Sequence, residues 1–398
     1  MHYIRLLRPP KVTRKRQPQL ELLVTITTDL GDSFLYPEAP VKLVVTAYTK
    51  SPSGTKPWIL PNKENLLWTP GMRVAKLALP LPAPLDKAIS SGASADVCVS
   101  ATQELTADGV ENILSASLES AEDEGGQIMP AWVTLGGPDA DVDVLTRRLV
   151  LGSANDASSM ELEEEIGESI ARHIWDAGVL AMCAIAGAYL QPQAESSQQD
   201  CIKALKEILS SKKSVNILEL GCGVGILGLG LASLITQMRA DGLEKCTILM
   251  TDLEEAEGRA RSNMERIAKN IPPVARDSVD MIYENLDWED GRKGVFPASV
   301  GGQAWDLIML SDCTYNVDML PALTETLSAI HTSNAAQRDK GTAPTRVFLA
   351  TKPRHSSEQA LFDLMSGQKW EQIEKQVLPL PVLGCEAQTV ELYMFEKK

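Results

Sequence analysis

The most restrictive feature of this chain is an apolar strand that runs directly into a glycine-rich turn. Residues 217–228 read ILELGCGVGILG, and a second apolar run ends further along the chain at Asp252. A strand, a glycine turn and a helix in this order direct backbone N–H groups toward a nucleotide-like ligand. The first question is therefore which ligand such a turn would hold.

The spacing of the glycines distinguishes between two possible kinds of ligand. A dinucleotide site needs G-x-G-x-x-G/A. The turn instead runs G-x-G-x-G over Gly221, Gly223 and Gly225, and Ile226 stands where the third small residue would be. Glu219 precedes the turn, where it would repel a pyrophosphate but attract the amino group of an amino-acid-like ligand. These features favour S-adenosylmethionine over NAD.

The end of the second apolar run suits the ribose of the same cofactor. An ionised carboxylate can accept hydrogen bonds from both hydroxyls of a diol, and Asp252 stands at the expected place. The alternative is an ordinary βα turn whose glycines only make a tight bend. The order of strand, turn, helix and second acidic strand end favours the cofactor site.

Three more motifs accompany the glycine turn. They are IWDAG at residues 174–178, LDW at 286–288 and SDCTY at 311–315. With them, residues 166–398 resemble the seven-β-strand, Rossmann-like methyltransferases, and more narrowly the methyltransferase-like protein-lysine methyltransferases of the family 16 type. The resemblance implies S-adenosylmethionine as the cofactor. It implies cofactor-binding roles for Trp175, Glu219, Gly221, Cys222, Gly223, Asp252, Asp287, Trp288 and Ser311.

Two of these motifs also have a chemical reason. Trp175 lies in a segment that we expect to be helical, from which its indole face could cover the cofactor; the alternative is an ordinary core tryptophan. Asp287 and Trp288 follow a strand-like run over residues 279–283. They therefore fall at the carboxyl end of a parallel strand, where they could contact the adenine.

The last motif predicts the chemistry. In enzymes that this chain resembles, D-x-x-Y, here Asp312 and Tyr315, marks protein-lysine methylation, so these two residues are the catalytic candidates. A carboxylate and a phenol on one loop can orient an amine toward a methyl group. Because a free lysine has a pKa of about 10.4, we expect Asp312 to orient the amine rather than to act as a strong base. The alternative is a helix N-terminus capped by Asn316 or Asp318.

The catalytic half, residues 160–398, alternates strands with helices. This order predicts an α/β fold with a doubly wound, mostly parallel seven-stranded sheet and a terminal antiparallel hairpin. The strands are expected at residues 217–220, 247–251, 279–283, 305–310, 346–352, 372–378 and 388–396. The helices are expected at residues 226–237, 254–270, 319–330 and 356–365, with a loop over 332–344.

The first 151 residues are organised differently. Residues 1–19 contain six basic and no acidic side chains, which predicts a flexible arm that touches RNA or lies on an acidic surface. Residues 20–151 are a β-rich region, either a recognition module or a structural extension. Its strands are expected at residues 20–27, 41–49, 128–134 and 147–151, its loops at 79–85 and 90–94, and an acidic helix follows at 161–190.

The composition of the chain limits its possible partners and its cellular location. The net charge of −15 argues against a general nucleic-acid binder and suits a basic protein partner. No apolar stretch reaches the roughly 20 residues of a membrane span. The seven cysteines contain no C-x-x-C pair, and the four histidines are scattered, so we expect free thiols and no metal site. We expect a cytoplasmic monomer, with a nuclear location as the alternative.

The sequence as a whole predicts an S-adenosylmethionine-dependent protein-lysine N-methyltransferase. The resemblance makes a translation elongation factor one candidate target. A small-molecule amine methyltransferase is the first alternative. A catalytically idle interaction protein is the second, and the intact acidic positions argue against it: Glu219, Asp252, Asp287 and Asp312.

Overall fold

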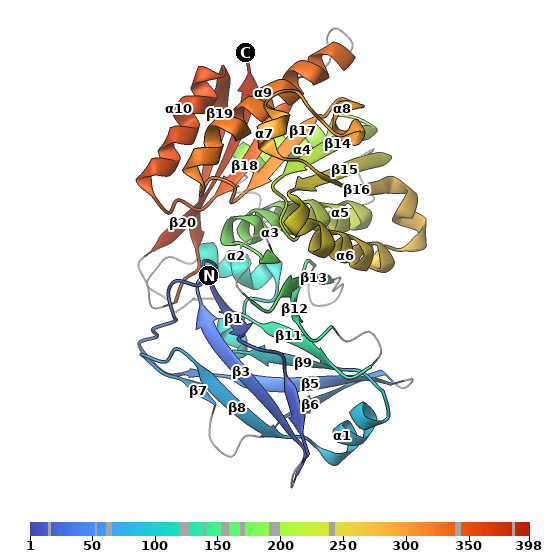
Figure 1. The fold of residues 1–398 in the computed structure, drawn as a ribbon, viewed down its shortest axis with the longest axis vertical. Helices are drawn as coiled ribbons and strands as arrows, with labels where there is room; N and C mark the ends of the chain where they lie inside the picture. The colour runs from blue at the N-terminus through green and yellow to red at the C-terminus, as the bar shows by residue number, and fades with distance from the viewer. Residues whose placement is uncertain are drawn as a thin grey trace. The chain divides into compact units, whose positions relative to one another are not determined.

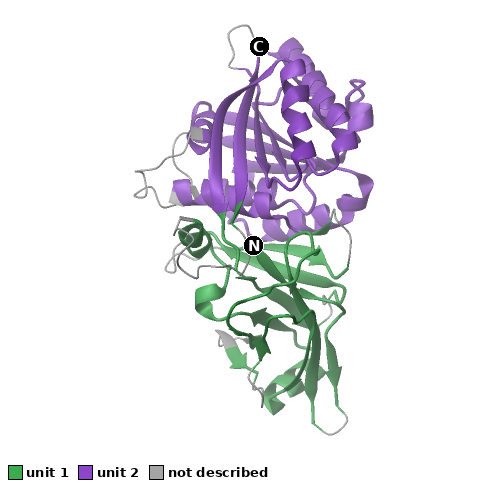
Figure 2. Ribbon diagram, turned by 90° about the vertical axis from the view of Figure 1, so that its left-hand side faces the viewer, with its two compact units in different colours: residues 1–173, 380–388 green, residues 174–379, 389–398 purple. Residues whose placement is uncertain are grey.

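The computed structural model divides the chain into two compact units (Figure 2). The first unit contains Met1–His173 and Leu380–Gln388, and the second contains Ile174–Pro379 and Thr389–Lys398. The second unit begins at residue 174 and excludes residues 380–388, while the predicted domain boundary near residue 160 stays a prediction. The structure describes residues 1–14, 17–51, 54–60, 66–118, 128–137, 141–152, 159–167, 172–190, 200–238, 243–338, 344–383 and 387–398.

Two larger β-sheets and a short strand pair form the first unit, which confirms the β-rich expectation (Figure 1). One sheet has the order β10 (Ile128–Met129), β1 (His2–Leu6), β3 (Gln19–Thr27) and β2 (Lys11–Thr13), with β8 (Ala75–Pro80) also paired to β3. The other has the order β13 (Ser159–Glu165), β12 (Val144–Val150), β11 (Ala131–Leu135), β9 (Ala95–Ser100), β5 (Val44–Ser51) and β6 (Gly54–Ile59). Strands β4 (Val41–Lys42) and β7 (Leu67–Trp68) pair separately, and the helices are α1 (Ala83–Ser90) and α2 (Val110–Leu118).

Apolar side chains from the two larger sheets share one core. Leu22 and Val24 of β3 belong to the same buried cluster as Val97 and Val99 of β9. Along strands such as β11, buried and half-buried residues alternate, as expected for a strand with one face turned to a core.

The beginning of the chain is an internal strand and not a flexible arm. Tyr3 and Ile4 of β1 are completely buried, and β1 pairs with β3 on one side and with β10 on the other. The described arginine side chains have partners within the first unit: Arg5 donates to the carbonyl of Asp29 at 2.6 Å, Arg8 lies 3.9 Å from Glu21, and Arg14 forms an ion pair with Asp86. Because its charges are engaged in this way, the start of the chain is not a free basic arm. Lys15 and Arg16 lie outside the described residues.

The acidic segment expected to be a helix from residue 161 begins as strand β13. Met160, Leu162 and Glu164 are buried, whereas the residues between them are half-buried, so the segment has the period of two that a strand requires. Pairing along β12 overrides the helical preference of a glutamate-rich run. The helix, α3 (Asp176–Leu190), begins only later.

Glu164 itself is held by a buried ion pair. The guanidinium of Arg147 contacts the Glu164 carboxylate at 2.5 and 2.8 Å, and both side chains are almost inaccessible to solvent. Burial alone would raise the pKa of Glu164, but the charge of Arg147 reverses this and the pKa is lowered. Arg147 also donates to two backbone carbonyls, which anchors it to the neighbouring chain segment.

The proline-rich segment over residues 79–85 is not a loop either. Strand β8 ends at Pro80, and α1 begins at Ala83 after Pro82 at its N-cap. Proline is compatible with the first turn of a helix, because the backbone N–H groups there have no partner within the helix.

The second unit contains a seven-stranded sheet. Its order is β16 (Val279–Asn285), β15 (Lys245–Asp252), β14 (Ser214–Leu220), β17 (Leu307–Ser311), β18 (Arg346–Thr351), β20 (Gln388–Lys397) and β19 (Trp370–Leu380). The five strands from β16 to β18 are parallel, and β20 is antiparallel to β18. The expectation of a doubly wound α/β sheet with an inserted antiparallel strand near the end is confirmed.

Helices cover the sheet in two groups (Figure 1). One group packs together as α3, α5 (Ile226–Met238) and α6 (Glu254–Asn270), with α4 (Asp200–Ser210) against α3. The other contains α7 (Trp288–Gly291), α9 (Leu320–Gln337) and α10 (Ala360–Gly367), whose apolar residues share a buried cluster with β14, β17 and β18. The short helix α8 (Ala298–Gly301) precedes β17. Helix α9 extends to Gln337, so the loop expected from residue 332 begins later.

None of the helices in the described parts of the chain is both long and apolar enough to cross a membrane.

Candidate active site

The candidate site lies where the strand order of the second unit reverses. From β14 the chain moves outward to β15 and β16, and it then returns to β17 on the other side of β14. Open α/β sheets bind ligands at such a switch point, beyond the carboxyl ends of the strands. The segments that leave β14 and β17 at this edge are the glycine turn and the loop ending in Tyr315. The sheet therefore brings together two motifs that lie far apart in the sequence.

The glycine turn depends on backbone angles that other residues avoid. Gly221, Gly223 and Gly225 have φ values of +67°, +54° and +90°. A Cβ atom on Gly221 would lie 2.6 Å from Sγ of Cys313, which is closer than real atoms approach. Glycine is thus required at Gly221 both for its conformation and for the close approach of the β17 loop.

A fourth glycine, which the sequence reasoning missed, packs α5 against the sheet. The N–H of Gly228 donates to Oε2 of Glu219 at 3.0 Å, and a Cβ atom there would lie 2.4 Å from the same oxygen. Counted from Gly223, the residues do fit G-x-G-x-x-G, with Gly228 as the third glycine. The glycine spacing alone therefore does not exclude a dinucleotide.

Glu219 is completely buried at the end of β14. Its Oε2 accepts the hydrogen bond from Gly228, while its Oε1 has no hydrogen-bond partner among the residues that the structure describes. Burial raises the pKa of Glu219 to about 8, and the nearby charge of Asp252 adds to the increase. A buried carboxyl oxygen without a partner is a suitable acceptor for a ligand's amino group.

Asp252 ends β15 beside the turn and helps to fix it. Its two oxygens accept hydrogen bonds from the N–H groups of Gly223 and Leu253, both at 2.7 Å. Burial raises the pKa of Asp252. The buried Asn263 of α6 donates to the carbonyl of Val224 at 3.0 Å and so supports the same turn from the other side. Asn263 is a second supporting residue that the sequence did not single out.

Asp287 and Trp288 lie after β16, as expected, but Asp287 also has a local role. It is the N-cap of α7, where its side chain accepts a hydrogen bond from the N–H of Glu289 at 2.9 Å. The indole of Trp288 lies next to the glycine turn, since a Cβ atom on Gly221 would come within 3.3 Å of it. Trp288 is therefore at the edge where an adenine would meet the turn.

The thiols at the site are unreactive. Burial raises the pKa of Cys222 and of Cys313 well above the usual range, so neither forms a thiolate at neutral pH. The N–H of Cys222 donates to the carbonyl of Thr251 at 3.0 Å, which ties the turn to the end of β15. Ser311 faces the first turn of α3, where a Cβ atom on Gly178 would lie 3.2 Å from its Oγ.

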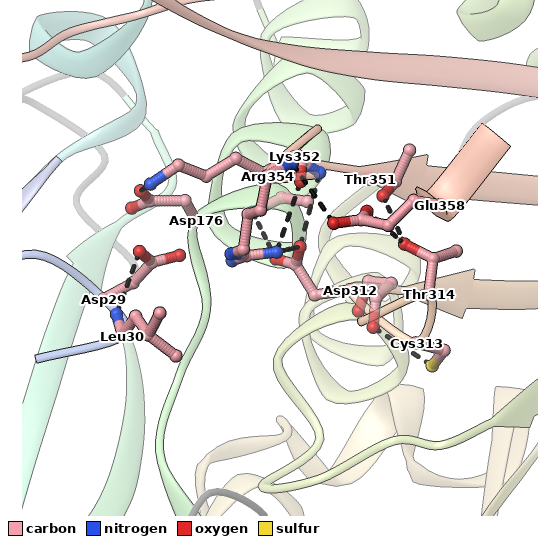
Figure 3. Close-up of polar contacts among 12 residues, drawn as sticks. Asp29, Leu30, Asp176, Asp312, Cys313, Thr314, Thr351, Lys352, Arg354 and Glu358 are labelled. Atoms are coloured by element: carbon pink, nitrogen blue, oxygen red, sulfur yellow. Dashed lines mark hydrogen bonds and ion pairs between the residues drawn. The ribbon is translucent and has the colours of Figure 1, made fainter. Parts of the chain in front are cut away.

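Asp312 is buried in a strained backbone conformation, with φ of +50°. Its Oδ2 accepts a hydrogen bond from the N–H of Ala177, at the start of α3, at 2.8 Å. Its Oδ1 accepts one from the N–H of Lys352 at 3.3 Å and forms an ion pair with Nη1 of Arg354 at 2.8 Å (Figure 3). Asp312 therefore joins three segments of the second unit, a role that its sequence motif did not reveal.

Tyr315 and Trp175 form a stacked aromatic pair beside this carboxylate. Their ring centroids are 6.4 Å apart and the rings are almost parallel, at 5°. The guanidinium of Arg354 lies over the Trp175 ring at 5.3 Å. Tyr315 remains 53% exposed, so one edge of the pair faces solvent. Trp175 lies just before α3 rather than within a helix.

Three further buried hydrogen bonds fix the loops around Asp312 (Figure 3). Lys352 donates to Asp176 at 2.7 Å, which connects the end of β18 to the first residue of α3. Thr314 donates to Glu358 at 3.0 Å and is hydrogen-bonded to Thr351 at 2.8 Å. The sequence offered a partial signal for Lys352 and Arg354, because both follow a buried strand at the carboxyl edge of the sheet.

The residues at this edge fit S-adenosylmethionine. A glycine turn with positive φ angles presents backbone to a ligand, and Asp252 stands beside it as an acceptor for hydroxyl groups. The unpartnered Oε1 of Glu219 and the indole of Trp288 add an acceptor for an amino group and a surface for stacking.

Three comparisons with known proteins place this geometry in a wider context. The chain is 25% identical to the UPF0665 family protein C23C4.06c of Schizosaccharomyces pombe over 371 residues, which are 92% of this chain and 93% of the relative. It is similar to a SAM-dependent methyltransferase from Methanosarcina mazei (12% identity, 49% of this chain and 96% of the other, TM-score 0.32). It is also similar to M. jannaschii TYW2 in complex with AdoMet (10% identity, 60% of this chain and 83% of the other, TM-score 0.30). At these TM-scores the two structures add no weight to the argument.

The family comparison does carry weight. The model of the family described as "Lysine methyltransferase" matches residues 154–368, more than half of the chain. This range contains the glycine turn, the LDW segment, the D-x-x-Y loop and the acidic end of β15. The chain is an S-adenosylmethionine-dependent methyltransferase and belongs to the lysine methyltransferase family.

Proposed function

We propose that this enzyme methylates the side-chain amine of a lysine in a protein substrate. The observation that carries the proposal is the exposed Tyr315, stacked on Trp175, in the loop that places the buried Asp312 beside the glycine turn. Aromatic faces and a nearby carboxylate suit the approach of an alkylamine. The lysine methyltransferase family model supports the same acceptor.

The cofactor would be held by the residues on the β14, β15 and β16 side of the site. We assign the ribose to Asp252, the amino group to Glu219, the adenine to Asp287 and Trp288, and close backbone contacts to the turn. The turn and its neighbours also include Gly221, Cys222, Gly223, Ser311 and Trp175. When bound, S-adenosylmethionine supplies a methyl group whose bond to sulfur breaks as the amine nitrogen forms its new bond to carbon, leaving a thioether.

The chain's contribution is to position the amine and to favour its neutral form. The lysine must lose its proton before its lone pair can react, and the loss of water around the bound amine disfavours the charged form. Near-attack positioning can supply up to about 7–11 kcal/mol in favourable cases. Asp312, already engaged by Ala177 and Arg354, acts by fixing the loop that presents Tyr315.

A protein substrate suits the open edge better than a metabolite does. About half of Tyr315 faces solvent, so a long side chain can reach the loop while the body of its protein stays outside. With a net charge of −15, the enzyme favours a basic partner. A translation elongation factor is one candidate target, and it would place the reaction in the cytoplasm.

The test is to incubate the enzyme with methyl-labelled cofactor and cell lysate, then to hydrolyse the labelled protein to amino acids. The expected product is Nε-methyl-lysine in one protein band, and the Gly223→Arg variant should give no label. Label confined to the small-molecule filtrate would indicate a metabolite acceptor instead. Label in a different amino acid would refute the lysine assignment.

A further inference from the structure

Arg354 occupies a position in the site that the cofactor does not explain. Its Nη1 lies 2.8 Å from Oδ1 of Asp312, its guanidinium lies over Trp175, and its side chain is only 12% exposed. The residue is also fixed by its backbone, because the N–H groups of Arg354 and His355 donate to Oε1 of Glu358 at 3.2 and 3.1 Å. Arg354 is thus a permanent positive charge held between the buried carboxylate and the aromatic pair.

We propose that Arg354 is a positioning residue that sets the proton state of the acceptor amine by neutralising Asp312. The proposal rests on the proposed function, because it presupposes an amine acceptor. A free lysine has a pKa of about 10.4, and only the neutral amine can form the new bond to the methyl carbon. An unopposed carboxylate beside the amine would hold it as ammonium, whereas a carboxylate paired with arginine has a much smaller effect.

The other charged groups around Asp312 are one further ion pair and several carboxylates. From α3 and the end of β18, Asp176 and Lys352 form a second ion pair at 2.7 Å. Glu358 accepts hydrogen bonds from two backbone N–H groups and from Thr314. On the cofactor side the groups that face the loop are Glu219, Asp252 and Glu255, with the uncharged thiols of Cys222 and Cys313. Removing Arg354 therefore adds one net negative charge next to the amine.

The net charge beside the amine determines the direction in which each substitution should shift the pH dependence of the rate. In Arg354→Gln the amine should keep its proton to higher pH, so the ascending limb of the single-turnover rate against pH should move up by about one unit. In Asp312→Asn the unpaired guanidinium should move the limb down by about one unit. The double variant should return the limb close to the wild-type position, and Arg354→Lys should leave it nearly unchanged.

The measurement is single-turnover methylation from pH 6 to 10, buffered at constant ionic strength. Enzyme is in excess over labelled cofactor, heat-treated lysate protein is the acceptor, and the label is counted as Nε-methyl-lysine. The matched control is Arg338→Gln. Arg338 is comparably buried (11% exposed) and forms an ion pair with Asp306, which precedes β17 at its opposite end. Cofactor binding is followed in parallel by calorimetry.

Opposite shifts in the two single variants, cancelled in the double variant and absent in the control, would support the role. Unshifted limbs, a loss of rate that is equal at every pH, or the same shift in Arg338→Gln would overturn it. If Arg354→Gln does not fold, Asp312→Asn and the double variant decide. A wild-type enzyme that yields no Nε-methyl-lysine would instead refute the proposed function, so the two failures are distinguishable.

Discussion

At the scale of single residues, the carboxylates of this site are held by backbone N–H groups. Glu219 accepts from Gly228, Asp252 from Gly223 and Leu253, and Asp312 from Ala177. These contacts fix the orientation of each carboxylate before any ligand binds. They also mean that a substitution here changes the shape of a turn as well as a ligand contact, so each test needs a comparison that keeps the hydrogen bond.

Glu219 gives a prediction about stability and pH. Its pKa in the folded chain is raised to about 8 by burial, so the folded state holds a proton that the unfolded state releases near its ordinary pKa of about 4.3. The stability that protonated Glu219 contributes to the folded state is thus present at low pH, and it is lost as the pH rises through about 8. Glu219→Gln should match the wild-type melting temperature at pH 5 and exceed it by several degrees at pH 9, without cofactor. An equal pH dependence of the melting temperature in the wild type and in Glu219→Gln would contradict the raised pKa of Glu219. The control is Glu255→Gln, at an exposed position.

Asp252 gives a prediction about cofactor affinity. Asp252→Ala removes an acceptor for the ribose and should weaken binding by about ten- to a hundredfold, the scale of a charged hydrogen bond of roughly 1.5–3 kcal/mol. Asp252→Asn keeps an oxygen for Gly223 and should be milder. Gly223→Arg should abolish binding, because its side chain would fill the turn. Calorimetry measures all three, and an unchanged affinity in Asp252→Ala would refute the ribose assignment.

The D-x-x-Y loop gives a prediction that separates binding from chemistry. Asp312→Asn should lower the plateau rate of single-turnover methylation, measured above the ascending limb, by orders of magnitude, while cofactor affinity changes by no more than about tenfold, or about 1.4 kcal/mol. Tyr315→Phe should be milder, because the ring remains stacked on Trp175. Near-wild-type turnover in Asp312→Asn would remove it from the reaction. Parallel losses of binding and turnover would move it into the cofactor site.

At the scale of elements, the close packing of α5 on the sheet depends on one glycine. A Cβ atom at Gly228 would lie 2.4 Å from the Glu219 oxygen and 3.0 Å from Met250, both in the completely buried interior. At Gly258 in α6, a Cβ atom would have no described atom within 4 Å apart from its chain neighbours and the backbone of its own helix. The two helices therefore provide a matched pair of positions.

Gly228→Ala should destabilise the chain by about 1–3 kcal/mol, since the helix or Glu219 must shift to make room. Gly258→Ala should stabilise it by about 0.5–1 kcal/mol, because alanine has less conformational freedom to lose in a helix. Denaturant unfolding of both variants measures the difference. Equal effects of the two substitutions would show that α5 does not need the close approach.

Sequence patterns predicted the elements of the second unit well because those patterns are local. An apolar strand followed by a glycine turn and an apolar helix has few other structures available, and α6 spans the expected residues 254–270. The first unit was harder, because a strand there is defined by its partners. Strand β1 is only five residues long, and the glutamates of β13 suggest a helix until β12 pairs with them.

The distinction between local patterns and features that depend on distant partners also applies to the candidate site. Motifs on single segments identified Glu219, Asp252, Asp312 and the aromatic residues, which the sheet then placed at one edge. The partners of those residues could not be predicted in the same way. The pairing of Asp312 with Arg354 depends on β17 lying next to β18 and on a loop that turns back toward α3. Such contacts follow from topology, which single-sequence patterns specify only coarsely.

At the scale of the whole molecule, every cofactor motif lies in the second unit, although the family match begins in the first unit, at residue 154. The first unit has a separate apolar core and its own buried ion pair between Arg147 and Glu164. The similarity to the Schizosaccharomyces pombe protein nevertheless extends over 92% of the chain, so that relative has counterparts of both units. This favours a role for the first unit in the working enzyme, and recognition of the protein substrate is the role we propose.

A truncated chain tests this division. It begins at Ile174, where the second unit starts, and a glycine–serine linker of equal length replaces Leu380–Gln388, which belong to the first unit. Because the glycine turn, Asp252 and the D-x-x-Y loop remain with their own core, calorimetric cofactor affinity should stay within about threefold of the full chain, or about 0.7 kcal/mol. Methylation of the lysine-containing protein band should fall by at least about tenfold if the first unit recognises that protein, since each 1.4 kcal/mol of lost binding is a factor of ten.

Full methylation by a cooperatively melting truncated chain would show that the second unit recognises its substrate alone. Loss of cofactor binding together with loss of a cooperative melt would show instead that the second unit needs the first in order to fold.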